Sequence, residues 1–331
     1  MDKSVRFTLV ATVLLGILLY AVLRFANEIQ ETAEDDPMTA VTNDTPVQTE
    51  AAATAAAAPT PSLPRAGDHR QLVALLGVRG IDGEQATAAA AAWFEARGYT
   101  GAIGLLGVTA DDSRSTYFDT LDEATLIAMS EGGDAGATQS LARVAMFTDP
   151  FEALELYRKA AAQGSIYAVI KVAETLSMFA DTQLVDYAEE PKQVERLLQL
   201  QQSVPGKNLP TEAYATALAA LGDGGPPIIS GQLLDWTDTL MERAPPEMRD
   251  TACRRSAEIL IDNSAARQDN DAEPMSTRPP PVFVAPTDID ARMPCADTDF
   301  PIISLMNLDD CATERVIDAR EEEANLHICA R

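Results

Sequence analysis

The sequence predicts an all-α protein: a short array of helical hairpins with less regular flanking helices, preceded by one transmembrane helix and a disordered tether. The composition supports this class, because Ala and Leu are strong helix formers and aromatic residues make up only 5% of the chain. A pattern of small residues recurs through the middle of the chain at the interval of stacked helical hairpins. One long apolar run near the start predicts the transmembrane helix.

A transmembrane signal-anchor helix is predicted over residues 7–26. The apolar run there suits a hydrocarbon core, which a helix of about twenty apolar residues crosses. Lys3 and Arg6 precede the run, so the positive-inside bias keeps residues 1–6 in the cytoplasm and sends the rest of the chain across. The alternative is a cleaved signal peptide. We expect the anchor to be retained, because the run exceeds a usual h-region and no A-x-A cleavage site closes it.

The composition divides the exported part into four segments. Residues 27–68 mix Ala, Thr, Pro and acidic residues and are expected to form a disordered linker, because they carry too little apolar surface to pack. Residues 69–265 are expected to form an α-helical repeat domain. Residues 266–282 resemble a polar, Pro-rich connector, and residues 283–331 a C-terminal segment stapled by disulfides.

The cysteines agree with export to an oxidising compartment. An even number of cysteines in a translocated domain predicts two disulfides. The segment from Cys311 to Leu326 looks continuously helical, which would hold Cys311 and Cys329 about 25 Å apart, beyond bonding range. We therefore expect Cys295 to pair with Cys311, and Cys253 with Cys329.

The charge balance limits which kinds of partner the protein is expected to bind, and the composition also bears on the compartment in which it lies. The chain has 51 acidic and 25 basic residues and a formal net charge of -26, which disfavours nucleic acid and favours a basic protein partner. We expect a single-pass protein of the inner (plasma) membrane, with the bulk of the chain in the periplasm. The lumen of the endoplasmic reticulum satisfies the same arguments, but the Ala-rich, acidic composition favours a bacterial protein.

A repeated pattern of small residues lies in the middle of the chain. Each copy has Gly, then Ala four positions later, then an aliphatic residue four positions after that, and the copies are offset by 35 and 31 residues. We expect the Gly to end one helix in the left-handed conformation and the Ala to allow close approach in the next helix. The three copies are Gly98, Ala102 and Leu106; Gly133, Ala137 and Leu141; and Gly164, Ala168 and Val172.

The clearest unit begins DPFEALELYRKAAAQG at Asp149, a predicted N-cap followed by Pro150 at the first helical position. This string resembles the Sel-one-like repeat family, which is related to tetratricopeptide repeats. The resemblance covers about residues 121–176, and Leu156 departs from it by replacing an aromatic residue. It implies a protein-interaction scaffold rather than an enzyme. The matching residues are Asp149, Ala153, Leu154, Tyr157, Arg158, Lys159, Ala160, Ala161, Gly164, Ala168 and Val172.

The sequence offers little for chemistry. There are two His residues, and the sequence has no P-loop, no G-x-G-x-x-G after a strand, no G-x-S-x-G and no H-E-x-x-H. No C-x2-C pair for a metal site accompanies His327, so we name no catalytic residue, cofactor or metal ligand. The predicted function is a membrane-tethered periplasmic scaffold for protein–protein interaction. The alternatives are a cell-wall glycan-acting enzyme with paired carboxylates and an envelope stress or signalling subunit. Carboxylate pairs occur at Asp111–Asp112, Glu189–Glu190 and Glu321–Glu323, and Trp93, Tyr157 and Trp236 could line a groove, although a core position is more usual.

Overall fold

The fold was analysed in a computed structural model of the whole chain. The chain divides into two compact units, Met1–Thr60 and Pro61–Arg331, and the described residues all belong to the second unit. The predicted anchor at residues 7–26 and most of the predicted tether lie outside the described residues. Among the residues that are described, no helix is long and apolar enough to cross a membrane. The described residues are 63–66, 68–99, 116–181, 190–204, 207–229, 231–269, 278–295, 298–299, 308–318 and 321–329.

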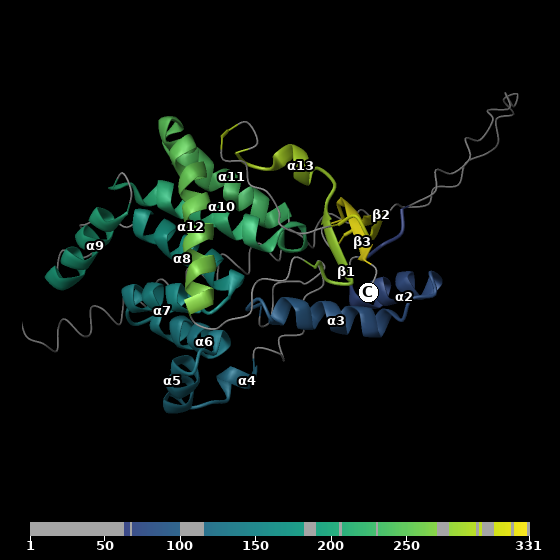
Figure 1. The fold of residues 1–331 in the computed structure, drawn as a ribbon, viewed down its shortest axis with the longest axis horizontal. Helices are drawn as coiled ribbons and strands as arrows, with labels where there is room; N and C mark the ends of the chain where they lie inside the picture. The colour runs from purple at the N-terminus through teal and green to yellow at the C-terminus, as the bar shows by residue number, and fades with distance from the viewer. Residues whose placement is uncertain are drawn as a thin grey trace, which may run out of the picture. The chain divides into compact units, whose positions relative to one another are not determined.

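The described part is predominantly helical, which confirms the predicted class at that level (Figure 1). The helices from α5 to α8 pack one on the next, α10 packs on α8, and α12 packs on α10. The helix α9 lies beside this stack rather than within it (Figure 1). The α-helices are α2 (His69–Val78), α3 (Gly83–Glu95), α4 (Thr116–Asp119), α5 (Glu123–Glu131), α6 (Ala135–Ala145), α7 (Pro150–Ala162), α8 (Ile166–Asp181), α9 (Pro191–Ser203), α10 (Leu209–Gly224), α11 (Gly231–Arg243), α12 (Arg249–Asp269) and α13 (Ile289–Arg292). Short 3-10 helices span Pro226–Ile228 (η4) and Pro246–Met248 (η5).

The repeated glycines end helices as predicted. Gly98, Gly133 and Gly164 have φ values of 83°, 93° and 106°, in the left-handed region that other residues resist. Each lies in the same hydrogen-bonded helix ending, in which the next residue's N–H reaches back to the carbonyl five positions earlier. A fourth helix ending of this kind lies at Gly80 and was not predicted from the sequence. The four bonds run from Ile81 to Leu76, Tyr99 to Phe94, Asp134 to Met129, and Ser165 to Ala160.

The repeat residues after these glycines mostly form the core. Ala137 and Ala168 are fully buried, and Val172 is buried, so the second and third copies are packed as expected. Leu141 is half-buried, and Ala102 and Leu106 of the first copy lie outside the described residues. The α7 residues of the repeat string are also buried: Ala153, Leu154, Tyr157, Ala160 and Ala161.

A polar cluster joins the α5–α6 turn to the α7–α8 turn. The hydroxyl of Thr138 lies 2.7 Å from Gln163 Oε1 and 2.8 Å from Ser130 Oγ. Gln163 Nε2 donates to the Ser130 carbonyl, and Lys159 Nζ donates to Ser130 Oγ. Because these groups are partly or fully buried, their mutual bonds fix the register of one hairpin against the next.

Residues 311–317 and 323–329 form strands, which corrects the prediction of a helix over residues 311–326. Strands β1 (Val282–Pro286), β2 (Cys311–Ile317) and β3 (Glu323–Cys329) form an antiparallel sheet in the order β1-β3-β2. The apolar side chains of β3 alternate, with Ala324 and Leu326 buried on one face, and this period of two suits a strand. Here the stabilisation from strand pairing and burial outweighs the local preference of the residues for a helix.

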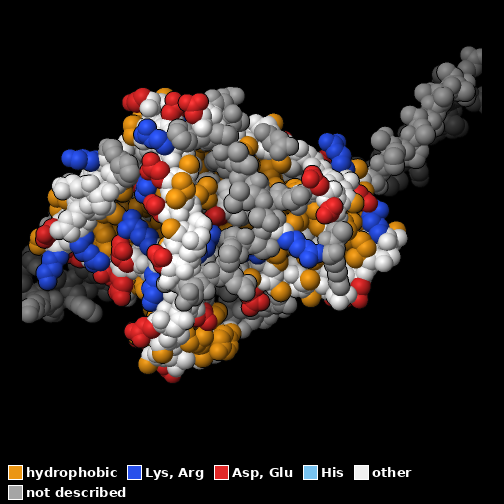
Figure 2. Space-filling model, viewed as in Figure 1, with side chains coloured by type: hydrophobic (Ala, Val, Ile, Leu, Met, Phe, Trp, Pro, Cys, Tyr) orange, Lys and Arg blue, Asp and Glu red, His pale blue; other side chains and the backbone are white. Residues whose placement is uncertain are grey.

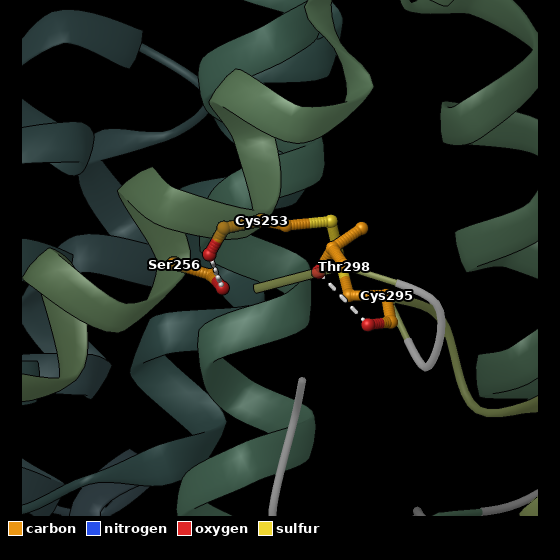
Figure 3. The surroundings of a disulfide bond; sticks show 4 residues. All are labelled: Cys253, Ser256, Cys295 and Thr298. Carbon is orange, nitrogen blue, oxygen red and sulfur yellow. Dashed lines mark hydrogen bonds between the residues drawn. A yellow bond between two sulfur atoms is a disulfide. The ribbon is translucent and has the colours of Figure 1, made fainter. Parts of the chain in front are cut away.

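The disulfide pairing differs from the predicted one. Cys311 lies directly opposite Cys329 in the register of β2 and β3, and the two are bonded. The distance argument that excluded this pair failed because it assumed a helix. Cys253 of α12 bonds to Cys295, which follows α13. Figure 3 shows this second disulfide, with the Thr298 hydroxyl donating to the Cys295 carbonyl at 2.9 Å.

The sheet shares a small core with α2 and α3. Leu72 and Leu76 of α2 belong to the same buried cluster as Phe283 of β1 and Leu326 of β3. The chain enters this cluster through Ala66, which is fully buried and donates its N–H to the Ile317 carbonyl at 2.8 Å. The last residues of the predicted tether therefore belong to the folded unit.

Candidate functional site

Two neighbouring pockets form a groove along the helical stack. The first has a volume of about 350 Å³ and is lined by α7, α8, α10, α12 and the end of α9. The second has a volume of about 380 Å³ and lies between α7 and α9. Arg158 and Ser203 line both pockets, so the two are adjacent. We call them together the α7–α12 groove.

Apolar side chains line part of the first pocket, while most of its exposed surface is polar. Val169, Val172 and Leu176 recur along one face of α8, and Ile259 of α12 lies across from them. Ala161, one of the predicted repeat residues, lines the pocket from α7. The repeat pattern therefore supplies part of this surface through Arg158, Ala161 and Val172.

A buried ion pair forms one wall of the first pocket. Glu212 of α10 is only 7% exposed, and Arg255 of α12 binds both of its carboxylate oxygens at 3.2–3.3 Å. Burial lowers the pKa of Arg255, but hydrogen bonds and charge from Glu212 and Glu258 outweigh burial, so the pKa is raised. Removing either partner would leave the other charge poorly solvated, which is costly. The intact pair therefore holds α10 against α12.

Arg255 also contacts two further carboxylates on α12. Glu258 and Asp262 follow Arg255 on one face of α12, at 3.2 Å and 3.7 Å from its guanidinium. Arg158, on the opposite rim, is paired with Glu155 at 2.8 Å. Among the residues that line the first pocket, the two guanidinium groups of Arg158 and Arg255 balance the two carboxylates of Glu212 and Asp262.

One polar side chain of the first pocket has no partner. The Nδ2 of Asn263 is buried, yet it makes no hydrogen bond. A buried donor without an acceptor costs about 1–3 kcal/mol.

The second pocket is closed on one side by α9. Arg196 of α9 binds both oxygens of Asp149, at 2.6 Å and 2.9 Å, and its guanidinium lies over the ring of Phe151. Burial raises the pKa of Asp149, but the Arg196 hydrogen bond and the N–H groups of Glu152 and Phe151 outweigh burial, so its pKa is lowered. The N-cap that the sequence predicts therefore also holds the rim of the groove.

The aromatic residues considered for a groove line neither of the two pockets. Tyr157 is buried in the main core, and Trp93 and Trp236 pack against that core while partly exposed. Arg97 lies over the Trp93 ring at 3.5 Å, and the indole N–H donates to the Arg278 carbonyl. These contacts give the three residues structural roles.

The predicted carboxylate pairs do not meet in a described pocket. Asp111, Asp112 and Glu189 lie outside the described residues, and Glu190 is exposed at the start of α9. Glu321 and Glu323 are exposed near the β2–β3 turn. Among the described residues, no group of three His, Cys, Asp or Glu side chains is placed to hold a metal ion.

The groove residues on α10 and α12 escaped the sequence reading because no motif marks them. The spacing of Arg255, Glu258 and Asp262 predicts a shared helix face, but their meeting with Glu212 depends on tertiary packing. Comparison of the chain with known protein families, curated proteins and solved structures finds no match. The function must therefore be argued from the groove itself.

The chemistry available in the groove favours binding. Glu212 and Asp262 line one pocket, but both already contact Arg255. Glycoside hydrolysis needs one carboxylic acid that carries a proton, and pairing with a guanidinium works against that role. A recess lined by fixed, mutually paired polar groups beside apolar side chains instead suits a recognition site.

Proposed function

We propose that the protein is a membrane-tethered scaffold outside the cytoplasm and that it binds a protein partner in the α7–α12 groove. The observation that carries this proposal is the groove, in which apolar side chains of α8 and α12 lie beside paired charges of α10 and α12. Interfaces commonly combine an apolar centre with a polar rim and arginine anchors. The resemblance of residues 121–176 to Sel-one-like repeats points to the same role.

The cellular arrangement rests on other features. The apolar run at residues 7–26 would anchor the chain, and the Ala/Thr/Pro-rich segment after it would hold the folded unit away from the membrane. Two disulfides fit an oxidising compartment, for which the periplasm is our choice. Acidic and basic side chains are interspersed over the face seen in Figure 2, but the net charge of -26 favours a basic partner.

The proposal is tested by site-specific photo-crosslinking in intact cells. A crosslinking residue at Ser203 lies on the rim shared by both pockets, where the side chain is exposed. The control is Val78 on α2, which is 84% exposed and outside both pockets. We expect a discrete protein adduct from position 203 and none of that mass from position 78. The same adduct from both positions, or none from position 203, would refute groove binding.

A further inference from the structure

We propose that helix α9 occupies a helix-docking site on α7, and that an amphipathic helix of the protein partner displaces it. The displacing helix carries Arg and two Leu at the spacing of Arg196, Leu197 and Leu200. This inference rests on the proposed function and specifies its partner. It is built on three features of α9: the contacts that it makes, the looseness of its attachment, and the space that remains between it and α7.

The side of α7 next to α9 presents one stripe of residues. They recur at helical spacing, line the second pocket together with α9, and are Phe151, Leu154, Glu155 and Arg158. Leu200 of α9 lines the same pocket, and both Leu197 and Leu200 are buried in the core cluster that contains Phe151 and Leu154. The stripe therefore already accepts the apolar face of a helix.

The contacts of α9 indicate which helix fits. The guanidinium of Arg196 lies 4.6 Å from the centre of the Phe151 ring and binds both oxygens of Asp149. The next residue, Leu197, and Leu200 one turn later supply the apolar contacts. Amphipathic helices commonly bind proteins by laying such a face into a groove. An arginine followed by two leucines three positions apart is thus the pattern expected of the partner helix.

The attachment of α9 is looser than that of its neighbours. No described element packs on α9 as extensively as α6, α7 and α8 pack on one another (Figure 1). Glu190 makes no side-chain capping bond at the start of α9. The side chains of Arg196 and Asp149 are 38% and 30% exposed, and an ion pair so accessible to water stabilises little. The buried amide oxygen of Gln193 has no donor, which also opposes the docked position.

The docked α9 leaves space beside α7. A pocket of about 380 Å³ remains between the two helices, so a partner helix that fills it gains dispersion contacts that α9 does not make. At the C-terminal end of α9, Val204 is buried and its carbonyl accepts the N–H of Lys207 at 3.0 Å. We expect this end to hold while the rest of α9 leaves, which keeps Ser203 near the site.

The first test uses a labelled synthetic peptide with the α9 sequence, residues 191–203, blocked at both ends. It is titrated with the full chain in a mild detergent and followed by fluorescence anisotropy. The chain variant Leu197→Ala with Leu200→Ala weakens the internal helix, so it should bind the peptide at least tenfold more tightly than wild type does. Leu198→Ala, at a neighbouring leucine that is 39% exposed, is the matched control and should behave as wild type. Equal affinity for wild type and the double variant overturns the inference.

A double-mutant cycle shows whether the peptide lies on α7. The peptide carrying Arg196→Gln should bind the double variant at least fivefold more weakly than the unchanged peptide does. When the chain also carries Asp149→Asn, which keeps a capping oxygen, the same change in the peptide should alter affinity less than twofold. Equal losses on the two chains would place the peptide elsewhere and contradict the inference.

Hydrogen exchange of the wild-type chain tests release of α9 without any substitution. Amides of α9 should exchange at least tenfold faster than those of α7 and α8, because α9 opens while the stack stays folded. Amides of α9 that exchange as slowly as those of α7 overturn the displacement.

Photo-crosslinking at Ser203 distinguishes this inference from the proposed function. If position 203 captures a partner while the peptide fails its tests, the scaffold stands and the helix inference falls. If the captured protein is a second copy of this chain, the occupant is that copy rather than a different protein, and the inference falls. If position 203 captures nothing, the proposed function falls and the inference falls with it.

Discussion

Asp149 uses one carboxylate for two tasks: it accepts the N–H groups of Phe151 and Glu152 at the start of α7, and it binds Arg196 of α9. The N-cap of the best repeat unit is therefore also the attachment of the helix that closes the second pocket. Asp149 thus belongs to the repeat unit and also holds a helix that lines the second pocket.

Two substitutions at Asp149 should separate its tasks. Asp149→Ala removes both cap and ion pair and should lower the free energy of unfolding by about 1–2 kcal/mol. Asp149→Asn keeps a capping oxygen but loses the charge that holds Arg196, so the loss should be smaller. In Asp149→Asn, the rate of backbone amide hydrogen exchange should increase more in α9 than in α7. Arg196→Gln is the matched control and should reproduce the α9 effect; unchanged exchange of α9 in both variants would contradict the attachment.

Three glycines should respond differently to alanine. Gly164 has a φ of 106° with open space where a Cβ would lie, so Gly164→Ala should cost about 1–2 kcal/mol from backbone strain alone. Gly98→Ala should cost more, because its Cβ would also lie 2.1 Å from Ser165 Oγ. Gly77→Ala, inside α2 and without contacts, should stabilise by up to about 1 kcal/mol. Denaturant unfolding measures the order, and equal effects at Gly77 and Gly164 would contradict the helix endings.

The disulfide pairs are directly measurable. Peptide mapping of the non-reduced chain should recover the links Cys253–Cys295 and Cys311–Cys329. Replacing Cys311 and Cys329 together by Ser should lower the free energy of unfolding by about 2–4 kcal/mol. A link between Cys295 and Cys311 would instead contradict the β2–β3 register.

His327 should make the sheet sensitive to acid. Burial lowers its pKa below the ordinary value, where its ring stacks on Phe283 and lies 3.1 Å from the Thr313 hydroxyl. The unfolded chain therefore binds this proton more tightly than the folded chain. Stability should be constant above about pH 6.5–7 and fall as the pH drops through the unfolded and then the folded pKa. Melting curves should show this fall in wild type and a smaller one in His327→Phe; an equal fall in both would exclude His327 as its source.

The helical part of the fold was predictable because its signals are local. Gly133 and Gly164 end helices, Asp149 caps one, and the small residues between them are buried, all of which follow from spacing and backbone preference. The sheet was not predictable in the same way. Residues 311–326 contain helix formers such as Glu314 and Ala324, and a strand becomes favourable there through the pairing of β2 with β3 and of β3 with the distant β1.

The groove was foreseen only in part. Ala161 and Val172 were singled out by the repeat, and both line the first pocket. Glu212 and Asn263 were not, because a Glu in an Ala-rich helix and an Asn near a helix end resemble ordinary surface residues. Their burial depends on how α10 and α12 pack on α8, which no spacing along the chain encodes.

Partner retention by a blocked groove tests the groove-binding proposal most directly. Ser203→Trp places a large side chain at the exposed rim shared by the two pockets, and Val78→Trp places one on exposed α2 as the control. The protein captured from position 203 should co-purify with wild type and Val78→Trp at equal yield. Its yield with Ser203→Trp should fall at least tenfold at an unchanged melting temperature. Equal yield from Ser203→Trp would contradict the groove as the binding surface.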